Sequence, residues 1–223
     1  MIAGVLLAAG ASTRMGHPKA LAKSGRDSFL IRCVRTLWTA CDGVTVVLGS
    51  RAPIVRRRAE LEFERLVSEG RMHAELTPAR RGASRRLEAQ FITNRKWQEG
   101  MLSSVREGLR AARGYEAESL LVLPVDHPDV RPETVRALAK LMGDALAACK
   151  TRKERAAFSY ALIPRSGGHR GHPVALTCAL ADAIAADREA TDLSEAVKRN
   201  ARLIGYLDVR DSGILRNRNS PKD

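Results

Sequence analysis

The stretch MIAGVLLAAGASTRMGHPKAL, residues 1–21, opens with an apolar run over residues 2–9. Such a run, without regular polar alternation, is typical of a strand buried on both faces of a parallel sheet. The run leads directly into a loop of small residues that carries Arg14 and Lys19. A buried strand followed by a cationic loop with glycines is typical of a phosphate-binding turn in an α/β sheet.

Apolar runs and helical patterns alternate through the rest of the chain, which indicates a mostly parallel sheet with helices on both faces. Asp27 or Ser28 is placed to cap the first helix. The last third has shorter elements, and we expect it to add an antiparallel edge. No linker interrupts residues 1–223, so we expect a single domain. Strands are predicted at residues 2–8, 44–48, 87–93 and 119–125, and helices at 29–41, 53–68, 101–113 and 132–149.

Composition excludes several classes of protein. No apolar run approaches the roughly 20 residues that a membrane span needs, and the N-terminal run lacks the basic start of a signal peptide. The net charge is +13, but the basic stretches carry no interleaved aromatic residues, which disfavours nucleic-acid binding. The cysteines form no C-x-x-C pair and read as buried free thiols of a cytoplasmic protein, at Cys33, Cys41, Cys149 and Cys178.

The loop after the first strand fits neither common phosphate-binding pattern. Gly10 and Gly16 are six residues apart and His17 follows the second, which excludes a P-loop, and G-x-G-x-x-G is absent. An ordinary turn with exposed cations is the alternative. The full spacing A-A-G-x-S-x-R-M-G-x-x-K favours a phosphate site, with Arg14 and Lys19 on phosphate oxygens.

Two further polar groups follow the third and fourth predicted strands. Residues 94–104 come after one strand and Asp126 after the other, so both are expected at the cleft of the first loop. Asp126 suits a Mg²⁺ ion that also bridges substrate phosphates, although a turn cap explains it equally well. Ser103 is expected to cap the helix that begins there. Trp97 is interpreted as a packing residue rather than a stacking ring.

Four motifs, taken together, resemble one family. They are LLAAGASTRMGHPKAL, NRKWQEGMLSSVREGL, LLVLPVDHPDV and GHRGHPVAL, and they span residues 5–176 in the family's order. The chain is thereby similar to nucleotidyltransferases, above all to the molybdenum-cofactor branch of cytidylyl- and guanylyltransferases. The resemblance implies a three-layer, Rossmann-like fold, with a mostly parallel sheet, helices on both faces and a mixed C-terminal part.

The resemblance also implies roles for individual residues. The resemblance implies that Asp126 and Asn219 bind Mg²⁺. It therefore favours a metal-binding role for Asp126 over the role of a turn cap. The family more often has carboxylates where this chain has Asn217 and Asn219, so the second ligand is weaker. The resemblance implies that Gly171 and His172 bind the acceptor. His169 and His172 have no cysteine or acidic partner at zinc-ligand spacing, so we do not expect a zinc site. The implied nucleotide-binding residues are Leu7, Ala8, Ala9, Gly10, Arg14, Lys19, Asn94, Ser103 and Ser104, with Arg14, Lys19 and Asp126 catalytic.

The implied reaction is the transfer of CMP from CTP to the phosphate of molybdopterin, with release of pyrophosphate. Guanylyl-transferring relatives tend to carry L-A-G-G, and the extra methyl of Ala9 here favours a pyrimidine. A client molybdoenzyme is a further expected partner. Two alternatives remain: a nucleotidyltransferase for a sugar phosphate or another phosphorylated alcohol, and a non-catalytic nucleotide-binding maturation partner.

Overall fold

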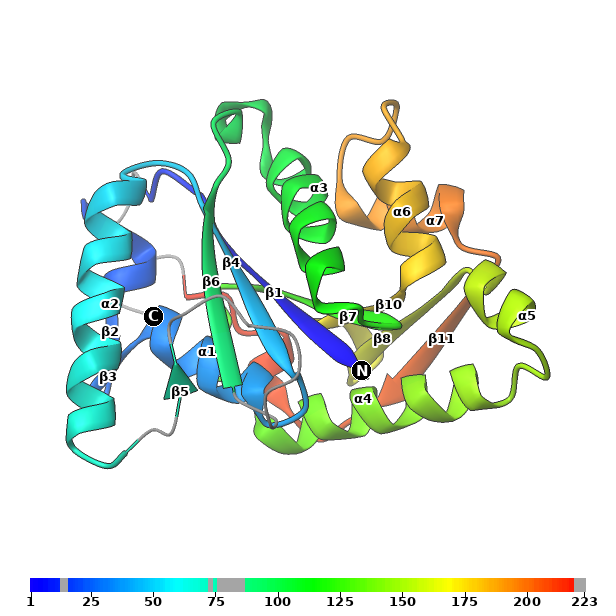
Figure 1. The fold of residues 1–223 in the computed structure, drawn as a ribbon, viewed down its shortest axis with the longest axis horizontal. Helices are drawn as coiled ribbons and strands as arrows, with labels where there is room; N and C mark the ends of the chain where they lie inside the picture. The colour runs from blue at the N-terminus through cyan, green and yellow to red at the C-terminus, as the bar shows by residue number, and fades with distance from the viewer. Residues whose placement is uncertain (13–15, 72–73, 76–86, 219–223) are drawn as a thin grey trace.

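A computed structural model describes residues 1–12, 16–71, 74–75 and 87–218 (Figure 1). Its centre is a nine-stranded sheet in the order β11-β8-β10-β7-β1-β4-β6-β5, with β9 paired to β8. The strands of this sheet are β1 Ile2–Ala8, β4 Gly43–Leu48, β5 Ala74–Glu75, β6 Leu87–Thr93, β7 Ser119–Pro124, β8 Tyr160–Ser166, β9 His169–Arg170, β10 Val174–Thr177 and β11 Leu203–Asp208.

The helices follow the predicted pattern closely, and a short hairpin of β2 Lys23–Ser24 and β3 Asp27–Ser28 lies outside the main sheet. The sequence pattern missed this hairpin and α5, which has only six residues. None of the described helices is long and apolar enough to cross a membrane. The helices are α1 Phe29–Trp38, α2 Ala52–Ser68, α3 Met101–Ala112, α4 Pro132–Ala147, α5 Arg152–Ala157, α6 Cys178–Ala186 and α7 Leu193–Asn200, and the 3-10 helices are η2 Lys19–Leu21, η3 Trp97–Glu99, η4 Arg113–Tyr115 and η5 Ser212–Ile214.

The predicted mostly parallel sheet with a mixed C-terminal part is confirmed, but the antiparallel strand β10 lies inside the sheet and not at its edge. β1 pairs in parallel with β4 and β7, and β4 pairs in parallel with β6. β10 runs antiparallel between β7 and β8, so the reversal lies inside the sheet. The edge strand β11 is parallel to β8. Strand polarity could not be read from the sequence because it depends on which neighbour a strand pairs with.

Helices cover both faces of the sheet, which explains why the run of residues that forms β1 is apolar throughout. Leu6 and Ala8 belong to the core beneath α1, α2 and α4. Ala3, Val5 and Leu7 belong to the other core, beneath α3, α6 and α7. Successive strand residues point to opposite faces, so a strand covered on both sides needs apolar residues at every position.

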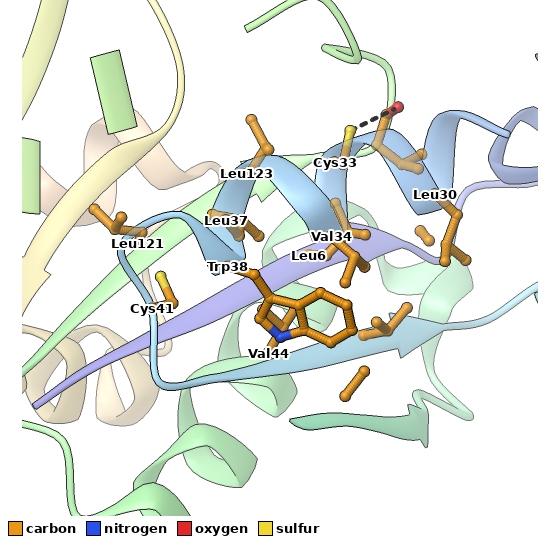
Figure 2. Packing of buried hydrophobic residues seen from close by; sticks show 14 of the residues in the cluster. Leu6, Leu30, Cys33, Val34, Leu37, Trp38, Cys41, Val44, Leu121 and Leu123 are labelled. Atoms are coloured by element: carbon orange, nitrogen blue, oxygen red, sulfur yellow. Dashed lines mark hydrogen bonds between the residues drawn. The ribbon is translucent and has the colours of Figure 1, made fainter. Parts of the chain in front are cut away.

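Helix α1 illustrates how the sequence sets an element and its packing. Ser28 is the N-cap, and its hydroxyl accepts a hydrogen bond from the Ile31 N–H at 3.3 Å. One face of the helix packs onto the sheet through Leu30, Val34 and Leu37 (Figure 2). Cys33 lies in the same core, and burial raises the pKa of its thiol far above the usual range. The thiol is therefore a packing group rather than a nucleophile.

We predict that Gly108→Ala lowers the free energy of unfolding by about 1–3 kcal/mol. Gly108 lies where α3 crosses the sheet, and an added Cβ would collide with the methyl groups of Val5 and Val47. Gly143 in α4 is the matched control because a Cβ there meets nothing within 4 Å, so Gly143→Ala should stabilise by about 0.5–1 kcal/mol. Urea unfolding measures both, and equal effects of the two substitutions would contradict this packing.

Candidate functional site

A cavity of about 320 Å³ lies beyond the carboxyl ends of β1 and β7, where ligands bind in open α/β sheets. Its volume is in the range of small-molecule sites. It brings together three of the segments singled out in the sequence: the first loop, the start of α3 and Asp126. The predicted residues that line it are Leu7, Ala8, Ala9, Gly10, Lys19, Ser104 and Asp126.

The two described ends of the first loop are tied together by one hydrogen bond. The backbone N–H of Lys19, at the start of η2, donates to the Ser12 hydroxyl at 2.8 Å. Ser12 and Gly16 both have positive φ angles, 53° and 69°, so the chain turns sharply at each. Arg14 lies outside the described residues. The loop therefore returns to the sheet with Lys19 directed toward the cavity.

Asp126 and Lys19 form an ion pair in the wall of this cavity. Lys19 Nζ lies 3.1 Å from Asp126 Oδ2, and the two side chains are only 17% and 16% exposed. His127 Nδ1 lies 3.0 Å from the other oxygen, Oδ1. Burial alone would raise the pKa of the Asp126 carboxyl, but the His127 hydrogen bond and the Lys19 charge outweigh it and lower the pKa to about 2. The carboxylate is therefore ionised at neutral pH.

Asn94 supports the cavity from behind rather than lining it. Its side chain is buried, and its Nδ2 donates to the hydroxyls of Ser103 at 2.8 Å and Ser104 at 3.0 Å. Its Oδ1 accepts from the Lys96 N–H at 2.8 Å. Ser104, and not Ser103, lines the cavity. Asn94 thus fixes the loop between β6 and α3 and orients one serine toward a ligand.

The predicted capping role of Ser103 is wrong. The N-cap of α3 is Gly100, whose φ of 97° is in the region that favours glycine. Ser103 is the third residue of the helix, and its hydroxyl donates to the carbonyls of Gly100 at 2.8 Å and Lys96 at 2.9 Å. The sequence suggested a serine cap because serine is common at that position, whereas the sharp turn required a glycine.

Trp97 belongs to the cavity wall, which the sequence analysis did not expect. It is half-buried in η3 and lines the cavity beside Gln98 and Met101. Behind it, Gly49 leaves room for both Trp97 and Ala9, since a Cβ at Gly49 would come within 2.6 Å of Trp97 Cβ and 2.8 Å of Ala9 Cβ. The ring is therefore available to a ligand rather than enclosed in the core. The glycine opposite the tryptophan was the signal that sequence reasoning overlooked.

Gly171 and His172 line a second cavity of about 410 Å³ that adjoins the first. The two cavities share Leu7, Met101 and Pro124 in their walls. Gly171 packs against the carbonyl of Ile214 in η5, so closely that a side chain would not fit. The His172 ring lies 4.9 Å from the ring of His127, and its Nδ1 has no partner among the described residues. Burial, followed by His127, lowers the pKa of His172 to about 4, so the ring is neutral at pH 7.

The C-terminal segment is bonded to the loop that carries Asp126. The Arg218 N–H donates to the Asp126 carbonyl at 2.8 Å, and its side-chain Nε donates to Asp129 Oδ2 at 2.8 Å. Asp129 also attracts Arg32 of α1 at 3.7 Å. Asp129 therefore anchors this segment to the loop between β7 and α4. Asn217 is exposed, and Asn219 lies outside the described residues.

One carboxylate facing a cavity fits a magnesium-type site, in which the substrate supplies most other ligands. Asp126 meets that requirement since it is ionised and lines the cavity. Within the described ranges, no group of three or more His, Cys, Asp or Glu side chains could hold a metal by itself. The residues therefore suit a cation that arrives with a phosphate ligand.

Comparisons with known proteins find one matching family model and several similar solved structures. The family model described as "MobA-like NTP transferase domain" matches residues 4–203. No curated protein sequence matches the chain significantly.

Solved structures share the fold at low sequence identity. Rv0371c from Mycobacterium tuberculosis H37Rv is 21% identical, with a TM-score of 0.62, over 93% of this chain and 87% of that chain. Mth528, a nucleotidyl transferase from Methanothermobacter, is 22% identical, with a TM-score of 0.62, over 100% and 94%. Molybdopterin-guanine dinucleotide biosynthesis protein A from Archaeoglobus fulgidus is 18% identical, with a TM-score of 0.57, over 99% and 93%. A second structure of Rv0371c is described as a complex with manganese.

We predict that Asp126 makes stability depend on acidity. Its pKa is about 2 in the folded protein against a usual 3.8, so its contribution is complete well above pH 4 and is lost as the pH falls toward 2. The shift corresponds to about 2 kcal/mol in total. Urea unfolding at a series of pH values should show this loss in the wild type and not in Asp126→Asn. Asp144→Asn, at an exposed position of α4, should keep it. Identical pH dependence in the wild type and Asp126→Asn would contradict the assignment.

Proposed function

The chain belongs to the MobA-like NTP transferase domain family, and from this premise we propose that it transfers CMP from CTP to molybdopterin. The observation that carries the proposal is the Lys19–Asp126 pair, at 3.1 Å, in a cavity that adjoins a second one. Two substrates need two adjoining sites, and the first cavity here supplies both a cation and an anion. We also propose that the chain acts as one domain, which the continuous sheet over residues 2–208 supports, and that it is cytoplasmic.

In this proposal the nucleotide occupies the first cavity. Residues 7–10 contact the base, Ser104 contacts the ribose, and Lys19 and Arg14 hold the triphosphate. Asn94 and Ser103 act indirectly, because Asn94 holds both serines and does not line the cavity. Trp97 joins the nucleotide side, since its half-buried ring lines the same wall.

Asp126 would hold a divalent cation, for which we propose Mg²⁺, with Asn219 as a second contact. When bound, such a cation withdraws charge from phosphate oxygens. Lys19, which pairs with Asp126 Oδ2 at 3.1 Å, would bind phosphate oxygens of the nucleotide. His127 Nδ1 lies 3.0 Å from Oδ1 and would orient the carboxylate toward the cation.

The acceptor phosphate occupies the second cavity beside Gly171 and His172. One of its oxygens attacks the α-phosphorus as the bond to pyrophosphate breaks, and pyrophosphate leaves with its charge held by Lys19 and Arg14. A phosphate monoester is already anionic at pH 7, so the step needs no strong base. The neutral His172 adds no like charge that would repel the cation.

The walls of the second cavity favour a ring system over a sugar phosphate. Apolar side chains form most of them, and the charged lining residues are Arg170, Lys198 and Asp192, with a net positive charge. A polyol would leave hydroxyl groups against apolar walls without partners, at a cost of about 1–3 kcal/mol each. A pterin with one phosphate matches this combination of apolar walls and charged side chains better. The apolar wall residues are Leu7, Met101, Pro124, Ile163, Val174, Leu193, Val197 and Ile204.

We predict that Asp126→Ala lowers the rate of pyrophosphate release with CTP, Mg²⁺ and molybdopterin by at least roughly 100-fold. Asp208→Ala, which removes a carboxylate 72% exposed in β11, is the control and should keep the wild-type rate. Full magnesium-dependent turnover in Asp126→Ala would refute the scheme. In the same assay, turnover of a sugar phosphate but not of molybdopterin would favour the other acceptor class. Tight CTP binding without pyrophosphate release by the wild type would favour a non-catalytic partner.

We predict that Ala9→Gly shifts the base preference toward GTP. Ala9 lines the cavity, with its methyl group in the wall formed with Gly49 and Trp97. Removing one methyl changes discrimination by about 1–3 kcal/mol, so the kcat/KM ratio of CTP to GTP should fall by roughly 10- to 200-fold. Ala40→Gly, in the turn after α1 and not among the residues that line the cavity, is the control. Equal turnover of CTP and GTP by the wild type would contradict the base assignment.

A further inference from the structure

Helix α2 presents an exposed stripe that mixes cations with aliphatic side chains. Ile54, Arg58, Leu61 and Arg65 recur at helical spacing, so they share one face. Ile54 is 55% exposed and Leu61 is 48% exposed. The opposite face packs into the core through Val55, Ala59, Phe63 and Leu66. Folding of this chain therefore does not account for the aliphatic residues of the stripe.

A groove of about 580 Å³ runs between this stripe and the segment that follows η2. Leu21, Lys23 and Arg26 form its other wall, next to the β2–β3 hairpin that lies alongside α2 (Figure 1). Lys19 and Ala20 line the nucleotide cavity, and the next residue, Leu21, lines the groove. We call this feature the α2 groove. It begins beside the cavity where the nucleotide is proposed to bind.

The charge of the α2 groove is strongly positive. Among the described residues that line it, the one carboxylate is Glu62, whose Oε1 already accepts from Lys23 Nζ at 2.7 Å and from the Ser28 N–H at 2.9 Å. Arg65 has only a loose ion pair with Glu69, at 3.9 Å. Arg26 and Arg58 have no ion pair or hydrogen bond with any residue in the described ranges. Weakly paired or unpaired arginines beside the exposed side chain of Leu61 and the partly buried Leu21 indicate a surface that another molecule covers.

We propose that the α2 groove docks an acidic segment of a partner protein, one that places aliphatic residues between its carboxylates. Carboxylates would pair with Arg26, Arg58 and Arg65, and aliphatic side chains would cover Leu61 and Leu21. A nucleic acid matches the charge but not the leucines, and no aromatic ring lines the groove for base stacking. The position beside the nucleotide cavity suits a partner that receives the product of this chain.

The test is binding of a fluorescent peptide of glutamates interspersed with leucines, measured by anisotropy at low salt. Leu61→Ser and Arg58→Glu should each weaken binding by roughly tenfold, because each removes or reverses one side of the complementarity. Two matched controls lie on the same helix outside the groove: Val67→Ser, at a position 45% exposed, and Arg57→Glu. Both should bind the peptide as the wild type does.

Peptide binding and nucleotidyl transfer are measured on the same variants, so the docking proposal and the proposed reaction are tested separately. All four variants should keep wild-type nucleotidyl transfer and thermal stability, so a loss of binding cannot come from misfolding or from a damaged active site. The docking proposal is overturned if the peptide does not bind, if an all-glutamate peptide binds equally well, if oligothymidine binds more tightly, or if the control variants weaken binding as much as the groove variants. None of these outcomes would bear on whether CMP is transferred.

Discussion

The site depends on the parallel pairing of β1 between β4 and β7, because this pairing brings three loops to one edge of the sheet. Hydrogen bonding continues one step beyond the strands. The Val125 N–H donates to Leu7 O at 3.0 Å, the Ser50 N–H to Ala9 O at 3.0 Å and the Asn94 N–H to Leu48 O at 2.7 Å. These bonds fix the first residue of each loop before any side chain acts. Asp126, Ala9 and Asn94 owe their relative positions to the backbone ladder.

Side-chain electrostatics then refine what the backbone sets. Asp126 is buried enough that an isolated charge would be costly, and Lys19 and His127 offset that cost from opposite oxygens. Asn94 has a comparable role without a charge. Its buried side-chain amide forms hydrogen bonds with two serine hydroxyls and with one backbone N–H. Asp126 and Lys19 lie in the cavity wall and Asn94 lies behind it, and each is held by hydrogen bonds to neighbouring groups. Such groups hold a site in one geometry before the ligand arrives.

Much of the site could be predicted from local pattern. Three local features were sufficient to predict one shared cleft. They are the apolar run over residues 2–8, the strand at 87–93 and the position of Asp126 at a strand end. Local pattern failed where a residue's role depended on distant neighbours. Ser103 was mistaken for a cap, Trp97 for a packing residue, and His127 was overlooked although it adjoins Asp126. Their roles follow from the turn at Gly100, the space at Gly49 and the orientation of an imidazole ring.

The sequence by itself determined the class of fold and the edge of the sheet where the chemistry lies. Periodicity and burial act within one segment, and residues a few positions apart carry that information. Only the tertiary structure decided the polarity of β10, the pairing of Lys19 with Asp126 across 107 positions, and the bond from Arg218 to Asp129. It alone brought the exposed stripe of α2 beside the loop that follows Lys19. These are contacts between segments far apart in the chain, and their geometry is set by how helices and strands pack rather than by any local preference.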